Sequence, residues 1–399
     1  MQSTAVQASR TIHPLRNSEK RLAVIAIGIA AGYVAALLRL YLSHHWILDV
    51  EGRPIATDFI AIWSAGKLVL AGAASSAYDI AHEHAAEVAS LGHSFHGALG
   101  WLYPPSFLFV AEGLARLPYG WSFAAWLCIT AGFYGFATAR AAGCWLGAAI
   151  ALAAPWTLAC ALVGQNGFLT AGLLALALTM VEERPALCGI LVGLLTYKPQ
   201  FGLLIPIALV AGGHWRVIGW AAATASLITV LSIAVFGPQA MSGFLSALPR
   251  TTQSLITNGA AGWQKLQSVY GLVRCLGGGN VTGWAFQGVA IAAAALWVAV
   301  LWRSKTPFAL KAAGLAVCAL LSTPYVFAYD MPMLGVATAF LYRDQRFDRL
   351  EYAGLGLAAL AMMPVLVAPL PVGLPGILIT GAMVARRAAL ASGRESRAG

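Results

Sequence analysis

The sequence has unusually few charged residues. Only 10% of its 399 residues are Asp, Glu, Lys or Arg, whereas about a quarter is typical of a soluble protein. Hydrophobic residues make up 59% of the chain and the mean hydropathy is +0.75. These values exclude a soluble globular enzyme, a disordered chain and an ordinary nucleic-acid-binding domain. They predict an all-α, polytopic integral membrane protein.

The common motifs of nucleotide and metal chemistry are also missing. There is no Gly-rich phosphate loop, no GxSxG elbow and no HExxH pair, so a nucleotide-driven pump is not expected and no cofactor is predicted. The six cysteines lack metal-ligand spacing, and we interpret them as small apolar residues of helix packing. They are Cys128, Cys144, Cys160, Cys188, Cys275 and Cys318.

Most of the histidines fall in one polar stretch, residues 44–103. A zinc site there is conceivable, but the spacing fits no strong template and no cysteine accompanies them. We therefore predict solvated loop histidines and no metal. The six are His44, His45, His82, His84, His93 and His96.

The hydrophobic residues form long runs, each read as a transmembrane segment of about 20 residues. Basic clusters near both termini predict that both ends are cytoplasmic, which requires an even number of crossings. We expect a cytoplasmic tail over 1–21, a transmembrane domain over 22–387 and a second cytoplasmic tail over 388–399. The twelve predicted spans are 22–42, 104–118, 121–140, 144–163, 166–181, 186–212, 216–236, 284–303, 308–323, 325–341, 350–367 and 370–386.

Two long polar stretches, about 44–103 and 237–283, fall outside in this topology. In the first, the stripe of Ile62, Gly66 and Val69 predicts an amphipathic helix on the membrane surface that begins at Asp58 and ends near Gly72. Tyr78-Asp79 is expected to begin a second short helix. The other stretch carries Arg250, Lys265 and Arg274 and no acid. Basic residues are usually concentrated in cytoplasmic loops, so cations in an outer loop are expected to have a local role.

Asp58 is the first candidate for chemistry, because it stands where the predicted surface helix begins. A carboxylate at that place is also a good helix cap, and this structural interpretation stays open.

Ionisable groups inside apolar runs are costly and are functional candidates by default. Lys198 lies mid-run and is followed by Pro199, which predicts a broken helix around a cavity. The alternative role for this lysine is to extend its side chain to the membrane surface or to pair with Glu112 for packing. Asp330 lies in the sequence FAYDMPML, where it serves either a polar cavity or a structural hydrogen bond.

Two further motifs stand at the ends of predicted spans. Tyr103-Pro104-Pro105 is typical of a helix start at the membrane interface, which structure alone could explain. The turn Gly164–Gly167 falls on the inner side in the predicted topology, which argues against a role in outer chemistry.

Together these motifs resemble glycosyltransferase family 87, whose members are polytopic enzymes of the C-type glycosyltransferase fold. The matching residues are Asp58-Phe59, Leu70-Ala71-Gly72, Tyr78-Asp79, Tyr103-Pro104-Pro105, Gly164-Gln165-Asn166, Lys198-Pro199 and Trp215-Arg216, in family order, with Ser322-Thr323-Pro324 later in the chain. Members often carry a histidine after that late segment, whereas this chain has Tyr329-Asp330 and no histidine beyond His214. A role of that histidine therefore cannot be carried over.

The resemblance implies a hexosyltransferase that takes a sugar, mannose by analogy, from a polyprenyl-phosphate donor. It implies a lipid or glycan acceptor, a site on the periplasmic face of a bacterial inner membrane, and Asp58 as the catalytic base. We add Lys198, Arg39, Arg250 and Lys265 as cations for the donor phosphate. Tyr103, Gln200, Tyr329 and Asp330 are expected in the substrate pocket.

A transporter or flippase of lipid-linked sugars is the alternative, since it too would use intramembrane Lys198 and Asp330. Transporters commonly show repeated halves. No repeat is visible in this sequence, which favours the transferase. With one catalytic carboxylate and direct attack, the reaction is expected to invert the anomeric centre.

Overall fold

The computed structural model describes residues 16–43, 57–92, 94, 99–365 and 367–398. Every regular element in these ranges is helical, which confirms the predicted all-α class. The bounds of the α-helices are α1 Asn17–Leu42, α2 Thr57–Leu70, α3 Ile80–Leu91, α4 Leu108–Ala115, α5 Tyr119–Ala142, α6 Leu146–Ala153, α7 Pro155–Val163, α8 Gly167–Leu178, α9 Pro185–Leu194, α10 Ile205–Ala211, α11 Trp215–Phe236, α12 Pro238–Thr251, α13 Val269–Cys275, α14 Asn280–Arg303, α15 Phe308–Leu321, α16 Pro332–Asp344, α17 Arg349–Met362 and α18 Gly373–Ala398.

Short 3₁₀-helical turns, and one π-helical turn (η5), lie between several of these helices. They are η1 Ala74–Tyr78, η2 Pro105–Phe107, η3 Leu195–Tyr197, η4 Pro199–Gly202, η5 Thr252–Thr257, η6 Trp263–Lys265 and η7 Ala328–Asp330.

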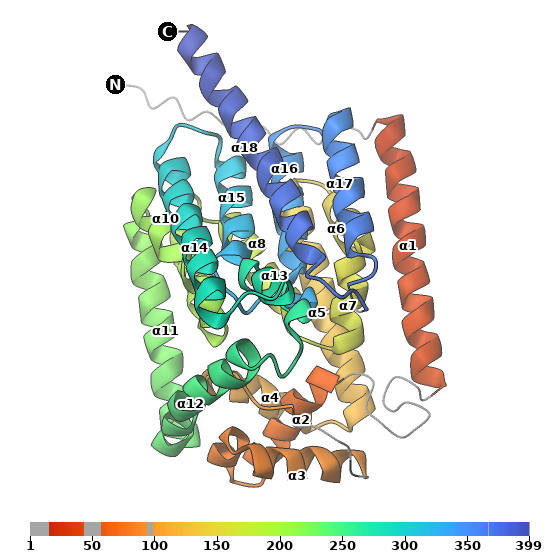
Figure 1. The fold of residues 1–399 in the computed structure, drawn as a ribbon, viewed down its shortest axis with the longest axis vertical. Helices are drawn as coiled ribbons and strands as arrows, with labels where there is room; N and C mark the ends of the chain where they lie inside the picture. Colours follow the sequence, from red (N-terminus) through yellow and green to blue (C-terminus); the bar gives the residue numbers. More distant parts are fainter. Residues whose placement is uncertain (1–15, 44–56, 93, 95–98, 366, 399) are drawn as a thin grey trace.

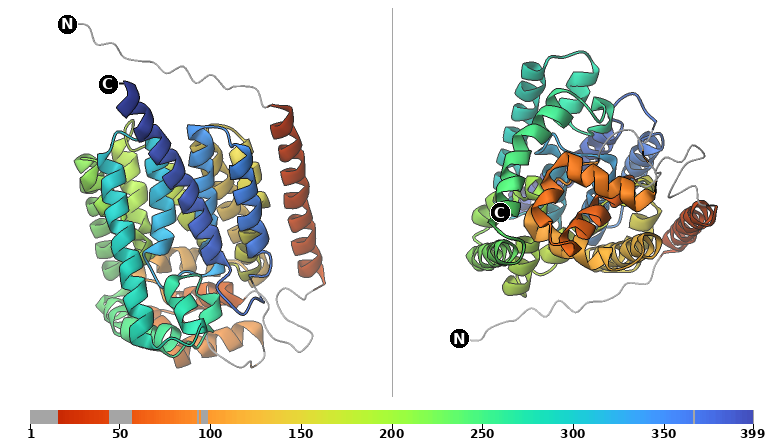
Figure 2. Two further views of the ribbon diagram at one scale, coloured as in Figure 1. Left: turned by 45° about the horizontal axis from the view of Figure 1, so that its top comes forward. Right: turned by 90° about the horizontal axis from the view of Figure 1, so that it is seen from below.

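The long helices run side by side, and α2, α3, α4 and α12 lie together at one end of this bundle (Figure 1). Helix α1 begins and α18 ends at the opposite end, as expected for a chain whose two termini share one side of the membrane (Figures 1 and 2). Seen from below, the helices that follow α1 cover the underside of the bundle (Figure 2).

The twelve predicted spans are not confirmed. Within the described ranges, five helices are long and apolar enough to cross a membrane, and six crossings result if the bent pair α6–α7 counts as one. The five are α1, α5, α11, α14 and α18. Several predicted spans are instead shorter apolar helices of 10–17 residues, because bends and breaks divide runs that hydropathy alone reads as continuous.

The predicted break at Pro199 is confirmed. Helix α9 ends at Leu194, the chain passes through η3 and η4, and α10 begins at Ile205. Proline at the start of η4 cannot donate a backbone hydrogen bond, so the helix cannot continue through Lys198.

Helix α2 exists near its predicted bounds, and Gly72 with φ of +75° follows its end. The N-terminal half of this helix packs against protein. Phe59, Ile60 and Ile62 are completely buried, and Ser64 and Ala65 are buried beside them. The helix lies against α3 and α4, so its N-terminal half is part of the protein core and Asp58 is positioned by that core.

Gly66 makes the close contact between α2 and α4 possible. A Cβ atom at this position would lie 2.1 Å from the Ala111 carbonyl oxygen, whereas one at Gly113 would meet nothing within 4 Å. Only a residue without a side chain fits at Gly66.

Replacing Gly66 with alanine should therefore destabilise the protein by about 1–3 kcal/mol through overpacking. Gly113→Ala is the matched control and should be neutral or stabilising, because alanine favours the helix. Thermal unfolding of the detergent-solubilised variants measures both. Equal melting temperatures for the two variants would contradict the close packing.

Candidate active site

A buried ion pair connects two distant parts of the chain. Lys198 Nζ lies 2.5 Å from Asp330 Oδ1, and the two side chains are 4% and 1% exposed. Asp330 Oδ2 also accepts a hydrogen bond of 3.0 Å from the Phe327 backbone N–H. Lys198 stands at the break between α9 and α10, and Asp330 stands in η7, so the pair joins two irregular segments inside the bundle.

Glu112, the alternative partner of Lys198, is not involved. Its carboxylate lies 2.5 Å from Arg116, one turn further along the same helical segment. The lysine therefore pairs with the other intramembrane acid.

Asn166 is the third member of this buried cluster. Its Oδ1 accepts a 2.8 Å hydrogen bond from Lys198 Nζ, and its side chain is completely buried. The turn that carries Asn166 was predicted to lie on the inner side, away from outer chemistry. The structure instead places the turn against the start of α2, so the predicted separation of the turn from the first polar stretch is wrong. Helices α6 and α7 bend by 64° at Pro155 and do not form one straight span.

Two glycines let this turn approach its neighbours. A Cβ atom at Gly167 would lie 1.7 Å from the Tyr329 carbonyl oxygen, so the start of α8 touches the backbone of η7. Gly164 has φ of +71°, and a Cβ atom there would lie 2.8 Å from Phe59 Cβ. Since Phe59 follows Asp58 in sequence, the turn also touches the start of α2.

Tyr103 and Gln165 extend the cluster towards Asp58. The Tyr103 hydroxyl donates to Gln165 Oε1 at 2.6 Å, and the same oxygen accepts the Asn166 backbone N–H at 3.1 Å. Burial raises the pKa of Tyr103 well above its ordinary value, and the negative charge of Asp58 raises it further. The Asp58 charge also acts on Tyr329. Three of the predicted site residues, Asp58, Tyr103 and Tyr329, therefore influence one another.

The cluster has a buried back and a partly open front. Asn166, Lys198 and Asp330 are buried, whereas Asp58 and Tyr103 are half-buried, as is Tyr329. The Lys198 ammonium lies 5.2 Å from the centre of the Tyr329 ring. Asp58 and the two tyrosines are therefore the members of the cluster that solvent reaches.

A sequence model of glycosyltransferase family 87 matches residues 101–324, more than half of the chain. The protein belongs to glycosyltransferase family 87. The matched segment contains Tyr103, Gln165, Asn166 and Lys198, whereas Asp58 and Asp330 lie on either side of it. No protein of curated function and no solved structure matches the chain.

This family-87 protein is therefore a membrane glycosyltransferase, and its most polar buried cluster is the candidate active site. Gln165 and Asn166 were missed as site residues because their turn was predicted on the opposite side of the membrane from Asp58. The available signal was the turn itself, in which two amide side chains stand between two apolar runs.

The other predicted cations lie elsewhere. Arg39 is exposed in the last turn of α1, Arg250 is exposed at the end of α12, and Lys265 is exposed in η6. The bonds described above for Lys198, Asp330, Asn166 and Tyr103 do not involve them. Gln200 is half-buried in η4, two residues beyond Lys198.

Arg274, the other cation of the second polar stretch, has a structural partner. Its guanidinium carbon lies 4.1 Å from the centre of the Trp263 ring, and its Nη2 donates to the Thr257 carbonyl. A cation–π contact of this kind is a local reason for one basic residue in that loop.

The predicted second helix of the first polar stretch is confirmed as α3, with Asp79 as its cap. Asp79 Oδ1 accepts from the Ala81 and His82 backbone N–H groups. His82 and His84 contact acids of the same helix region, Asp79 and Glu87 respectively. The histidines at 44, 45, 93 and 96 lie outside the described residues, and the described part shows no cluster of metal-ligating side chains.

Two buried carboxylates on α3 hold the backbone that leads to Tyr103. Glu83 Oε2 accepts from the Trp101 N–H at 2.5 Å, and Glu87 Oε2 accepts from the Leu99 N–H at 3.5 Å. Both side chains are essentially unexposed. Burial raises the pKa of Glu83 well above its usual range and that of Glu87 to about 7.

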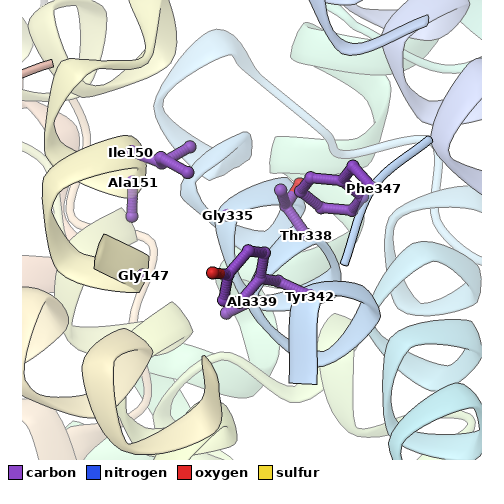
Figure 3. A pocket seen from close by; sticks show the side chains of 8 residues that line it. All are labelled: Gly147, Ile150, Ala151, Gly335, Thr338, Ala339, Tyr342 and Phe347. Atoms are coloured by element: carbon purple, nitrogen blue, oxygen red, sulfur yellow. The ribbon is translucent and has the colours of Figure 1, made fainter. Parts of the chain in front are cut away.

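A small apolar cavity lies between α6 and α16, lined by Ile150, Ala151, Thr338 and Phe347 among others (Figure 3). Its one phenol, Tyr342, already donates to Glu19. The lining offers little to hold a charged or sugar ligand, so this cavity does not compete with the polar cluster as the active site.

Lys198→Met should leave Asp330 buried without its partner and destabilise the protein by about 3–5 kcal/mol. The double variant Lys198→Met/Asp330→Leu removes both charges and should recover most of that loss. A double-mutant cycle on thermal unfolding in detergent measures the coupling. The exposed Lys265→Met is the control, and a double variant as unstable as the single one would contradict the pairing.

Glu87 should make stability depend on pH. Its pKa is raised in the folded state from 4.5 to about 7, so the fold favours the protonated form. Its contribution is complete below pH 4.5 and is lost as the pH rises towards 7. The melting temperature should fall over this window, and Glu87→Gln should flatten the decline. An unchanged slope in Glu87→Gln would contradict this assignment.

Proposed function

We propose that this family-87 protein transfers a hexose from a polyprenyl-phosphate donor to a hydroxyl of a lipid or glycan acceptor, with inversion and with Asp58 as the general base. Mannose is the favoured sugar by the family resemblance. The reaction would take place on the periplasmic face of a bacterial inner membrane. The observation that carries this proposal is the half-buried Asp58 beside the polar cluster of Tyr103, Lys198 and Asp330.

Asp58 is suited to accept the proton of an attacking hydroxyl. It lies in the first turn of α2, where the helix dipole stabilises a negative charge. Its half-buried side chain leaves access for a substrate hydroxyl, while the buried residues that follow it hold it in place. A positioned base of this kind contributes about 10²–10⁴-fold to a transfer rate.

The leaving group would be a phosphate, which needs positive charge more than it needs an acid. We propose Lys198 as the cation that faces it. Asp330 and Asn166 accept two of the three Lys198 N–H groups, which fixes the ammonium and leaves its third N–H for a ligand oxygen. Arg39, Arg250 and Lys265 stay predictions for the same role at the membrane surface.

The arrangement of the carboxylates supports inversion. A double displacement needs a second carboxylate that can act as a nucleophile or as an acid. Asp330 is the other acid of the cluster, but it is buried and paired with Lys198. With Asp330 held in this way, Asp58 acts alone and the acceptor attacks the sugar directly.

The isoprenoid chain of the donor would need an apolar groove. One groove of this kind lies between α1, α6, α7, α16 and α17, and its lining includes Ile25, Ile29, Trp156 and Leu355. Helix α7, which contributes Trp156, packs against η7, the segment of Tyr329 and Asp330. Helix α7 therefore contacts both this groove and the segment that carries Asp330.

Asp58→Asn should reduce transfer by about 10²–10⁴-fold and leave folding intact, because asparagine has nearly the same size and remains polar but cannot act as a base. The assay uses purified protein, polyprenyl-phosphate mannose with a labelled sugar, and membranes of a strain that lacks the protein as the acceptor source. Asp79→Asn is the matched control, since it makes the same change at the cap of α3.

Full transfer by Asp58→Asn would contradict the base assignment. Movement of the labelled lipid across vesicles without any transfer in the wild-type protein would favour the flippase. A missing hexose in the envelope glycans or glycolipids of the deletion strain would name the acceptor.

A further inference from the structure

The proton of the Tyr103 hydroxyl has a defined direction. Gln165 Oε1 accepts the Asn166 backbone N–H, and a backbone N–H can only donate. The side-chain oxygen of Gln165 must therefore face this turn, and its amide nitrogen must point away. Tyr103 shares the same oxygen at 2.6 Å, so its hydroxyl must be the donor in that bond.

Gln165 cannot easily turn away from this arrangement. The Asn166 carbonyl accepts from the Thr170 hydroxyl at 3.0 Å, and the Asn166 side chain accepts from Lys198. Gly167 touches the backbone of η7. The backbone on the C-terminal side of Gln165 is therefore held by contacts from two other segments.

Asp58 belongs to the helix start that contacts the turn of Gln165. Phe59 packs against Gly164, the residue before Gln165, which brings the start of α2 to the turn. Among the charged groups that act on Tyr103, Asp58 has the largest effect. A tyrosine has a single O–H, so the proton given to Gln165 is not available to Asp58.

We propose that Gln165 is a positioning residue that holds the Tyr103 proton away from Asp58, so that Asp58 keeps the basicity it needs to accept a proton from the acceptor hydroxyl. This inference rests on the proposed role of Asp58. A hydrogen bond donated to a carboxylate stabilises its charged form and weakens it as a base. With its proton committed, Tyr103 instead presents lone pairs to the front of the site, where a substrate hydroxyl can donate to it.

The inference predicts the behaviour of three variants. In Gln165→Leu the Tyr103 hydroxyl loses its acceptor and is free to donate to Asp58, so the pKa of Asp58 should fall by about one unit. In Tyr103→Phe/Gln165→Leu no hydroxyl remains, so the pKa should return towards that of the wild type. Tyr103→Phe alone should leave it near the wild-type value.

The test reads Asp58 in two independent ways. Carbodiimide labelling of full-length protein in detergent, followed against pH by peptide mass spectrometry, gives the ionisation midpoint of Asp58 without any turnover. The pH profile of sugar transfer gives the acidic limb of kcat. Both should move to lower pH by about one unit in Gln165→Leu, with a severalfold lower plateau rate, and both should recover in the double variant.

Other charged and titratable groups near Asp58 need a control. Tyr329, Asp330 and Lys198 surround the same place, and a loosened turn could alter them all. Thr170→Val removes the hydroxyl that binds the Asn166 carbonyl and meets Tyr197, so it weakens the same turn and leaves the Tyr103–Gln165 bond intact. It should lower the melting temperature without moving the Asp58 midpoint.

The outcomes separate the two proposals. An unchanged Asp58 midpoint in Gln165→Leu, or a double variant that recovers nothing, would overturn the role of Gln165. If the midpoint moves as expected but Asp58→Asn still transfers sugar at the wild-type rate, the proton arrangement holds and the base assignment fails. A Thr170→Val variant that reproduces the Gln165→Leu shift would reduce Gln165 to a structural residue.

Discussion

The ion pair between Lys198 and Asp330 is the interaction on which the rest of the site depends. Each charge alone would be very costly inside an apolar bundle, and together they tolerate burial only with good geometry and further hydrogen bonds. Asn166 and the Phe327 N–H provide those bonds. The pair therefore requires three irregular segments to meet: the break after α9, the turn before α8, and η7.

This meeting point also explains where the helices stop. Backbone groups at helix ends have no partners within the helix, and in an apolar environment they must be satisfied by other parts of the protein. Here the ends of α7, α8, α9 and η7 face one another in the interior. An aromatic layer seals one side of this region, since Tyr103, Phe107 and Tyr197 pack ring against ring. The polar groups that remain accessible lie at the front, beside Asp58.

Much of this arrangement could be predicted from the sequence. The low charge content was sufficient to predict an all-α membrane protein. Because few charged residues lie inside apolar runs, Lys198 and Asp330 could be identified as candidates. The proline after Lys198 was sufficient to predict the break in the helix. These features are local or compositional, so they need no knowledge of how the chain packs.

The features that were wrong depend on bends and on long-range contacts. Hydropathy records the length of an apolar run but not the bend at Pro155, so the predicted topology separated Gln165 and Asn166 from Asp58. The apolar stripe of α2 was assigned to lipid, because a sequence pattern cannot distinguish a membrane surface from α3 and α4. The partner of Lys198 was equally hidden, since Glu112 lies nearer in sequence than Asp330.

The separation of the two charges along the chain has a consequence for biogenesis. Lys198 enters the membrane long before the ribosome has made Asp330, so for much of synthesis the lysine has no counter-charge. During that interval the break after α9 cannot adopt its final form, and the nascent N-terminal half must be tolerated by the insertion machinery with an unneutralised ammonium. Only after η7 has been made can the Lys198–Asp330 pair form and join the two segments.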